Sequence, residues 1–319
     1  MKNEARRHHY ISQFYLKGFG KIPAKNPQIT VINLDKKNYF VTTANNLANI
    51  RDFNRINVPN MRADAIEKIL SDFETKAADA IREVQKTKLF EGDNSLLILE
   101  LMAVFTSRNP GRRENTTDFM SRIFETTSAT ILRYDAEFKR TTEDLAAKLG
   151  ADVDKMSTHE LNHFLFEKTQ LKLSNEYHLQ TESKYIETIF ITLTQRKWVL
   201  VQASEQTGPI IASDNPVILC WNNSDKVPAF VRNSPGHAMQ NTAVFFALSQ
   251  HLLLIGVYDD SDNVVLPPNE SLVAHYNTIS INSSNKQIYV PNFDFRIVTT
   301  NEGIQDGHWL KGKVNLTKK

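Results

Sequence analysis

The spacing of apolar residues changes near residue 197 of this 319-residue chain, and that change constrains the fold more than any other feature. From Ile66 to Val84 apolar residues recur every three or four positions, which is typical of an amphipathic helix. Beyond Trp198 short apolar runs alternate with clusters of Pro, Gly, Asn and Asp, which is typical of β-strands. Because strands follow helices without alternating with them, the order favours an α+β fold over a doubly wound one.

Caps and turn residues set the boundaries of the predicted elements. The stretch SLLILELMAVF predicts a buried helix that ends at Asn109-Pro110-Gly111. The alternation in QITVINLDKKNYFVTTANN predicts a β-hairpin. The predicted elements are the hairpin over 28–46, helices over 66–84, 94–107, 112–139, from 157 and over 175–196, and strands in KWVLVQAS, PIIAS, PVILCW, TAVFFALS, HLLLIGVY, KQIYVP and around Ile279 to Ser283.

The chain is expected to form a single two-lobed domain over residues 1–319. An N-terminal strap and the β-hairpin precede a helical lobe over 58–197, and the β-rich part comprises 28–46 and 198–300. With 41% apolar residues, a chain of this length can bury a substantial core.

Charge and cysteine content exclude several classes of protein. Lys and Arg number 38 against 36 Asp and Glu, so electrostatic binding must come from local patches such as ARRHH and RNPGRR. Cys220 is the single cysteine, which excludes an internal disulfide and a zinc site built from cysteines. The longest apolar run contains Glu100 and is too short to span a bilayer, and the first twenty residues lack the apolar region of a secretory signal. We therefore expect a cytoplasmic protein without a membrane partner.

The segment RRHHYISQFYLKGFG concentrates groups that carry chemistry. His8, His9 and Gln13 lie among aromatic residues, and imidazoles serve as acids, bases or ligands near neutral pH. The alternative is that the aromatic residues dock a terminal segment while both histidines remain in solvent.

The segment SRNPGRRE brings three arginines to a helix break. The guanidinium groups of Arg108, Arg112 and Arg113 suit phosphate or carboxylate, and the last two lie in the electropositive first turn of the next helix. The alternative is an ion pair between helices.

The segment IIASDNPVI places a polar turn between two apolar strands. The side chains of Asp214 and Asn215 then emerge at a strand end, where ligand-binding groups are common. Such residues also form turns for purely local reasons.

The pattern HELNH, residues 159–163, matches the zinc-protease motif. It would supply His159 and His163 as ligands and Glu160 as general base, with Glu176 or Glu182 as a third ligand. Against this interpretation, a capping box with Ser157 already accounts for Glu160.

Together these motifs resemble a widespread microbial family of unknown function. The resemblance rests on HHYISQFYLKGF at 8–19, ASDNPV at 212–217, the helix end LELMAVFTSRNPGRRE and the strand KWVLVQA, and it extends over nearly the whole chain. It implies that His8, His9, Gln13, Arg108 and Asp214 meet in space, and it implies no reaction. The proline usual in the opening motif is Ser12 here, which puts its rigid extended turn in question. HELNH lies outside the family pattern.

If these residues converge, the set favours phosphodiester hydrolysis. His8 or His9 would act as acid or base, and Asp214 would orient an imidazole or help to hold a divalent metal ion. The residues expected to bind substrate are Arg108, Gln13, Arg112 and Asn215. The favoured function is a nuclease-like hydrolase acting on a phosphodiester or other anionic substrate, with nucleic acid or a phosphorylated small molecule as partner. The alternative is a non-catalytic sensing or binding module for an anionic ligand, and the minor alternative is the zinc metalloprotease. Cofactor and oligomeric state stay open.

Overall fold

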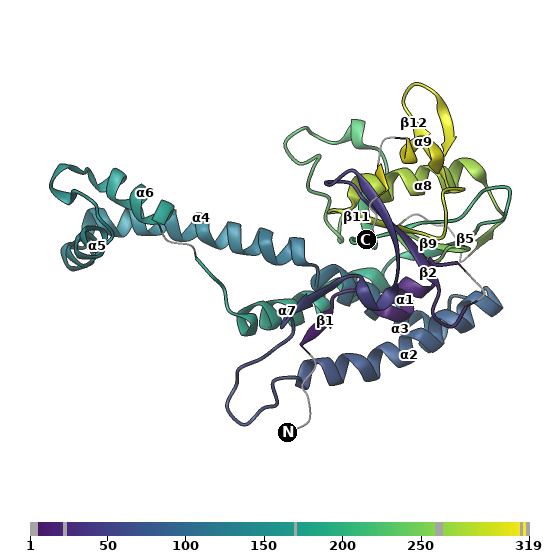
Figure 1. Ribbon diagram of the computed structural model, residues 1–319, viewed down its shortest axis with the longest axis horizontal. Helices are drawn as coiled ribbons and strands as arrows, with labels where there is room; N and C mark the ends of the chain where they lie inside the picture. The colour runs from purple at the N-terminus through teal and green to yellow at the C-terminus, as the bar shows by residue number, and fades with distance from the viewer. Residues whose placement is uncertain (1–5, 22–23, 169–170, 259–263, 313–314, 317–319) are drawn as a thin grey trace. The chain divides into compact units, whose positions relative to one another are not determined.

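The computed structural model describes residues 6–21, 24–168, 171–258, 264–312 and 315–316 (Figure 1). The chain forms two compact units, one made of Met1–Asn109 with Leu179–Lys319 and the other of Pro110–His178. The expected helical lobe over 58–197 is therefore distributed over both units. The α+β class is confirmed, with long helices in the middle of the chain and most strands after them.

The opening segment forms a strap that packs into the core of the first unit. Strand β1 (Arg7–His9) pairs with β4 (Asn49–Arg51), and helix α1 (Gln13–Lys17) follows. The side chains of Tyr15, Leu16 and Phe19 are buried. The Tyr15 ring stacks on Phe246 and meets Phe105 edge-on, with centroids 5.2 Å apart in both pairs. The aromatic residues dock as the alternative interpretation of this segment expects, but His8 is buried with them and does not remain in solvent.

Two antiparallel helices of the first unit follow the predicted periodicity. Helix α2 (Ala65–Thr87) buries Ala77, Ala80, Ile81 and Val84, one stripe of its surface, and ends at Lys88 in the left-handed conformation. Helix α3 (Gly92–Ser107) packs beside it and is buried on most sides, as its continuous apolar sequence requires. Helix α7 (Asn175–Thr194) adds Ile189 and Leu193 to the same core.

While β1 with β4 and the later pair β12 (Arg296–Thr299) with β13 (Gly303–Asp306) form two-stranded sheets, most strands of the first unit form two five-stranded sheets. One has the order β10 (Val265–Leu266), β5 (Lys197–Gln202), β9 (Leu252–Val257), β8 (Thr242–Ser249) and β7 (Val217–Trp221). The other has the order β14 (Asn315–Leu316), β3 (Asn38–Thr43), β2 (Gln28–Asn33), β11 (Gln287–Val290) and β6 (Ala212–Ser213), so β2 and β3 are the predicted hairpin. The turn between β6 and β7 carries the chain from one sheet to the other.

One predicted strand is wrong. Residues 279–283 are the end of helix α8 (Glu270–Ser283), whose first turn is capped by the Asn269 side chain. Val273, Tyr276 and Ser280 are buried at helical spacing. The alternation in ISINSS is too short to outweigh this longer helical period.

The predicted helix over 112–139 is in fact two helices. Helix α4 (Pro110–Tyr134) ends at Asp135, and the carboxylate of Asp135 caps α5 (Ala136–Lys148) by accepting the N–H groups of Glu137 and Phe138. Helix α6 (Thr158–Lys168) completes the second unit around Leu132, Ala146 and Leu161. The remaining elements are β12 (Arg296–Thr299), β13 (Gly303–Asp306), α9 (Gly307–Lys311) and the 3-10 turns η1 (Ala44–Asn46), η2 (Val153–Lys155) and η3 (Ser224–Lys226). Within the described ranges, every helix is too short or too polar to cross a membrane.

Candidate functional site

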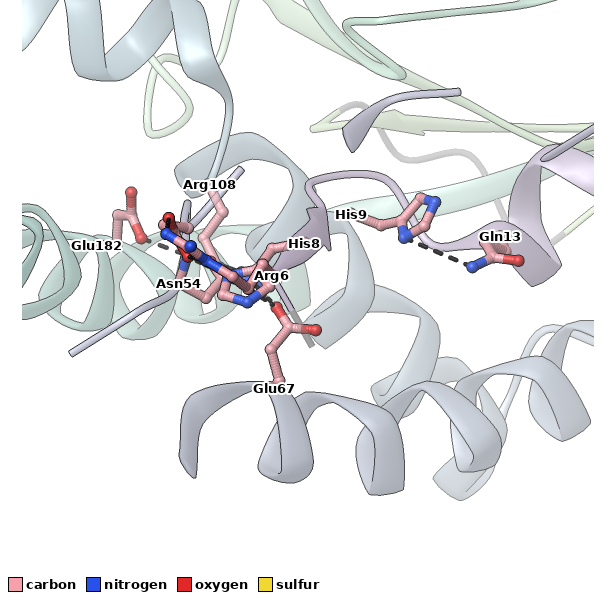
Figure 2. A network of polar contacts seen from close by, with 9 residues as sticks. Arg6, His8, His9, Gln13, Asn54, Glu67, Arg108 and Glu182 are labelled. Carbon is pink, nitrogen blue, oxygen red and sulfur yellow. Dashed lines mark hydrogen bonds and ion pairs between the residues drawn. The ribbon is translucent and has the colours of Figure 1, made fainter. Parts of the chain in front are cut away.

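The two adjacent histidines of the strap have different surroundings. Successive side chains of the extended β1 point to opposite sides, so His8 and His9 diverge (Figure 2). His8 is buried, and its Nδ1 accepts the backbone N–H of Asn54 at 2.8 Å. In this arrangement the ring proton of His8 is on Nε2. The same Nδ1 lies 3.8 Å from a carboxylate oxygen of Glu67.

Asn54 joins His8 to Arg108. The Asn54 side chain is fully buried; its amide donates to Glu67, and its carbonyl oxygen accepts from the Arg108 guanidinium. The Nε of Arg108 lies 3.9 Å from Oε2 of Glu182, and both side chains are almost completely buried. We call these five residues the His8–Arg108 network (Figure 2). A charge at this depth needs such partners, so Arg108, expected to bind substrate, has a structural task here.

His9 instead lines a cavity between the strap and helix α2, which we call the α2 cavity. Its volume is about 420 Å³. Side chains from one face of α2 form most of the wall, and Gln13, whose Nε2 lies 3.5 Å from Nδ1 of His9, joins from α1. The lining residues are His9, Gln13, Phe14, Glu67, Leu70, Ser71, Glu74, Thr75, Ala78 and Arg82.

Two titratable groups that line this cavity, His9 and Glu74, have pKa values shifted in opposite directions. Burial raises the pKa of Glu74 and Glu67 adds to the rise, while a hydrogen bond from Ser12 and the charge of Arg108 oppose it. Burial lowers the pKa of His9, while a hydrogen bond to the Asn45 backbone and the charge of Glu67 oppose this decrease. The carboxyl group therefore keeps its proton to higher pH than an exposed glutamate, and the imidazole loses its proton at lower pH than an exposed histidine. Burial is the main cause of both shifts, and titratable groups with perturbed pKa values in a cavity are candidates for a functional site.

Ser12 stands where the family resemblance led us to expect a proline. Its backbone angles, φ −60° and ψ 137°, are those that proline would impose, so the extended turn before α1 is kept without the ring. The buried Ser12 hydroxyl bonds to Glu74 instead.

Asp214 is held by backbone groups at the crossing between the two sheets. Its carboxylate accepts the N–H groups of Asn285 at 2.7 Å, Lys286 at 2.8 Å and Gln287 at 3.1 Å. Burial raises its pKa, and these three hydrogen bonds oppose the rise. Asn215 donates from its side chain to the carbonyl of Ser283 at 2.9 Å. Both residues thus tie the sheet crossing to the end of α8 and the residues that follow it, which are distant in the sequence.

Asp214 meets the strap through tyrosines. Tyr10 hydrogen-bonds to the buried Tyr289, and burial together with the Asp214 charge raises the pKa values of both phenols. Within the described residues, the contacts of Asp214 include neither His8 nor His9. Of the residues expected to share one site, the structure connects His8 to Arg108 through Asn54 and brings Gln13 to His9, while Asp214 interacts electrostatically with Tyr10.

The remaining expected residues lie in the second unit. Arg112 and Arg113 occupy the first turn of α4, where Arg113 is buried. In HELNH, His159 and His163 are exposed, Nδ1 of His163 lies 3.5 Å from Glu167, and Glu160 forms the capping box with Ser157. Among the residues that the structure describes, no group of three or more His, Cys, Asp or Glu side chains is arranged to hold a metal ion.

The sequence does not predict four residues on which the site depends, Asn54, Glu67, Glu74 and Arg82. Glu67 and Glu74 are seven positions apart on α2, a spacing that places two carboxylates on one helix face and could have identified them. Asn54 follows the short strand β4, and no pattern in the sequence marks it, because its role depends on contacts with His8, Glu67 and Arg108 from other parts of the chain.

A model of the family described as Protein of unknown function (DUF4238) matches residues 7–292. This is most of the chain, so the chain belongs to that family, and the resemblance to a family of unknown function is confirmed. The match includes every residue of the His8–Arg108 network and of the α2 cavity. No curated protein and no solved structure matches the chain.

Proposed function

We propose that this member of a family of unknown function is a hydrolase whose acid–base site is the α2 cavity. His9, neutral, takes a proton from the attacking water, and Glu74, protonated, gives one to the oxygen of the leaving group. The observation that carries the proposal is that His9 and Glu74 line one cavity, where burial raises the pKa of the carboxyl group and lowers the pKa of the imidazole. The His8–Arg108 network supports the site by holding Glu67 through a hydrogen bond from Asn54, and the charge of Arg108 acts on the carboxyl group of Glu74.

The proposed substrate is a phosphodiester or another anion, as in a nuclease-like enzyme. Arg82 is the cation among the lining residues, and its surface ion pair with Asp79 is weak enough to open for a phosphate. A protonated Glu74 reduces the negative charge that a phosphate would meet. Nucleic acid or a phosphorylated small molecule is therefore the proposed partner. Measuring activity in the presence of EDTA decides whether hydrolysis needs a divalent metal ion.

A non-catalytic binding module for an anionic ligand is the second candidate. The contacts of Arg108 and Asp214 favour this candidate. Both residues were expected in a catalytic site from the family resemblance, but their hydrogen bonds hold parts of the fold together. In that case the Arg82→Gln variant loses ligand affinity, whereas Glu74→Gln keeps it.

The first prediction concerns catalysis. With bis(p-nitrophenyl) phosphate as probe, Glu74→Gln should lower kcat/KM about 10²- to 10⁴-fold, since glutamine has no proton to transfer. Glu83→Gln, on the exposed side of the same helix, is the matched control and should keep full activity. The wild-type rate should peak on the acidic side of neutrality, because one group must be protonated while the other is not. Equal rates for Glu74→Gln and wild type would exclude Glu74 from the chemistry.

A further inference from the structure

A second cavity of the first unit, of about 780 Å³, lies between one face of a sheet and helix α8. Paired residues of neighbouring antiparallel strands share a face, and the pairs Cys220 with Ala243 and Phe245 with Ile255 form the floor. Helix α8 packs over the same face, where the rings of Phe245 and Tyr276 are 6.2 Å apart. We call this space the α8 cavity. Its floor is apolar, and its volume is in the range of small-molecule sites, about 300–1,000 Å³.

The described residues that line the α8 cavity include a cation but no carboxylate. Among the lining residues that the structure describes there is no aspartate or glutamate, whereas Arg232 is present, beside the polar rim of Asn222, Asn223 and Ser224. One guanidinium nitrogen of Arg232 donates to the carbonyl of Val227 at 3.2 Å. In the part of the chain that the structure describes, no carboxylate forms an ion pair with Arg232. Most of its donors therefore remain available to a ligand.

The loop that carries Arg232 is anchored to the sheet. The Trp221 indole at the end of β7 donates to the Arg232 carbonyl at 2.7 Å, which fixes the backbone of the arginine at the mouth of the cavity. The fold thus sets the backbone position of Arg232, from which the guanidinium group reaches the cavity lining.

We propose that the α8 cavity binds a small apolar carboxylate, with the apolar body on the sheet face and the carboxylate on Arg232. A guanidinium fork matches a carboxylate in geometry and charge. The aliphatic lining, which includes Val257, Leu272 and Ile279, suits an acyl chain. This site is independent of the α2 cavity and of the function proposed for it, since the two share no residue.

Cys220 in the floor provides a reporter. It is the single cysteine, and burial raises the pKa of its thiol to about 11, so the group stays protonated and reacts slowly at neutral pH. Its rate of alkylation by N-ethylmaleimide therefore reports on the α8 cavity alone.

The experiment measures this rate on the full chain with decanoate as probe and decanol as the neutral comparison, and measures decanoate affinity by calorimetry. Decanoate should slow the labelling in a saturable way, and decanol should protect at least about tenfold less well. Arg232→Gln should weaken decanoate binding about tenfold or more, as expected for a lost charge-assisted pair. Lys226→Gln, which removes an exposed cation of the same loop outside the lining, should bind like wild type.

Ala243→Leu, which fills the floor, should abolish protection while the melting temperature confirms folding; if it does not fold, Arg232→Gln decides. The proposal is wrong if decanoate gives no protection, if decanol protects equally, or if Arg232→Gln binds decanoate as tightly as wild type. Glu74→Gln should bind decanoate normally, which separates this inference from the proposed catalysis.

Discussion

Adjacent residues in an extended strand can have unrelated tasks. In β1 the alternation of side chains buries His8 against Asn54 and turns His9 to the α2 cavity. The doubled histidine of the opening segment is therefore one supporting residue and one residue available for chemistry.

The second prediction separates these two roles. His8→Ala should lower the free energy of unfolding by about 2 kcal/mol or more, because the Asn54 N–H loses its acceptor in a buried place and a void remains. His9→Ala should change stability much less, since its ring borders an open cavity, but should reduce hydrolysis. Urea denaturation of both variants measures the difference. Equal losses of stability would contradict the division of roles.

Asp214 gives the third prediction. Asp214→Ala should lower the free energy of unfolding by about 2 kcal/mol, since three backbone N–H groups lose their acceptor. Asp225→Ala, at an exposed position, is the matched control. A catalytic role for Asp214 would instead show as lost activity at unchanged stability, and that result would restore the expectation drawn from the sequence.

At the scale of the element, the strap contributes more to stability than its length suggests. Tyr15, Leu16 and Phe19 are each buried, and burying such a side chain contributes about 1.5–3 kcal/mol. Much of this offsets the entropy lost on ordering the segment.

The fourth prediction follows. Deleting residues 1–20 should lower the melting temperature by several degrees, because the stacked and edge-on partners of Tyr15 would be exposed. The substitution Lys21→Ala, at an exposed position just beyond the strap, is the control. If the truncated chain has the same melting temperature as the wild type, the strap does not stabilise the core.

The sequence predicts elements well where local patterns decide them. The apolar stripe of α2 and the alternation in β2 and β3 correspond directly to the observed helix and hairpin. The sequence predicts a strand at the end of α8 because a short alternation resembles a strand. It does not show the break at Asp135, because a capping aspartate inside a helical pattern resembles an ordinary exposed residue.

At the scale of the whole molecule, the site depends on contacts between distant segments. The pairing of His8 with Arg108 was expected from the family resemblance, yet the connection runs through Asn54, which comes from another part of the chain. Local patterns cannot show such a connection, because it exists only after β1, α2, α3 and α7 have packed. The same holds for Glu74, whose pKa rises only because the fold buries it.

Titration of His9 and Glu74 by NMR in the full chain tests the central claim most directly, with His9→Gln and Glu74→Gln used to assign the signals. The account predicts that Glu74 titrates above the ordinary glutamate value of 4.5 and His9 below the ordinary histidine value of 6.5. Ordinary values for both groups would contradict the claim that the α2 cavity is an acid–base site.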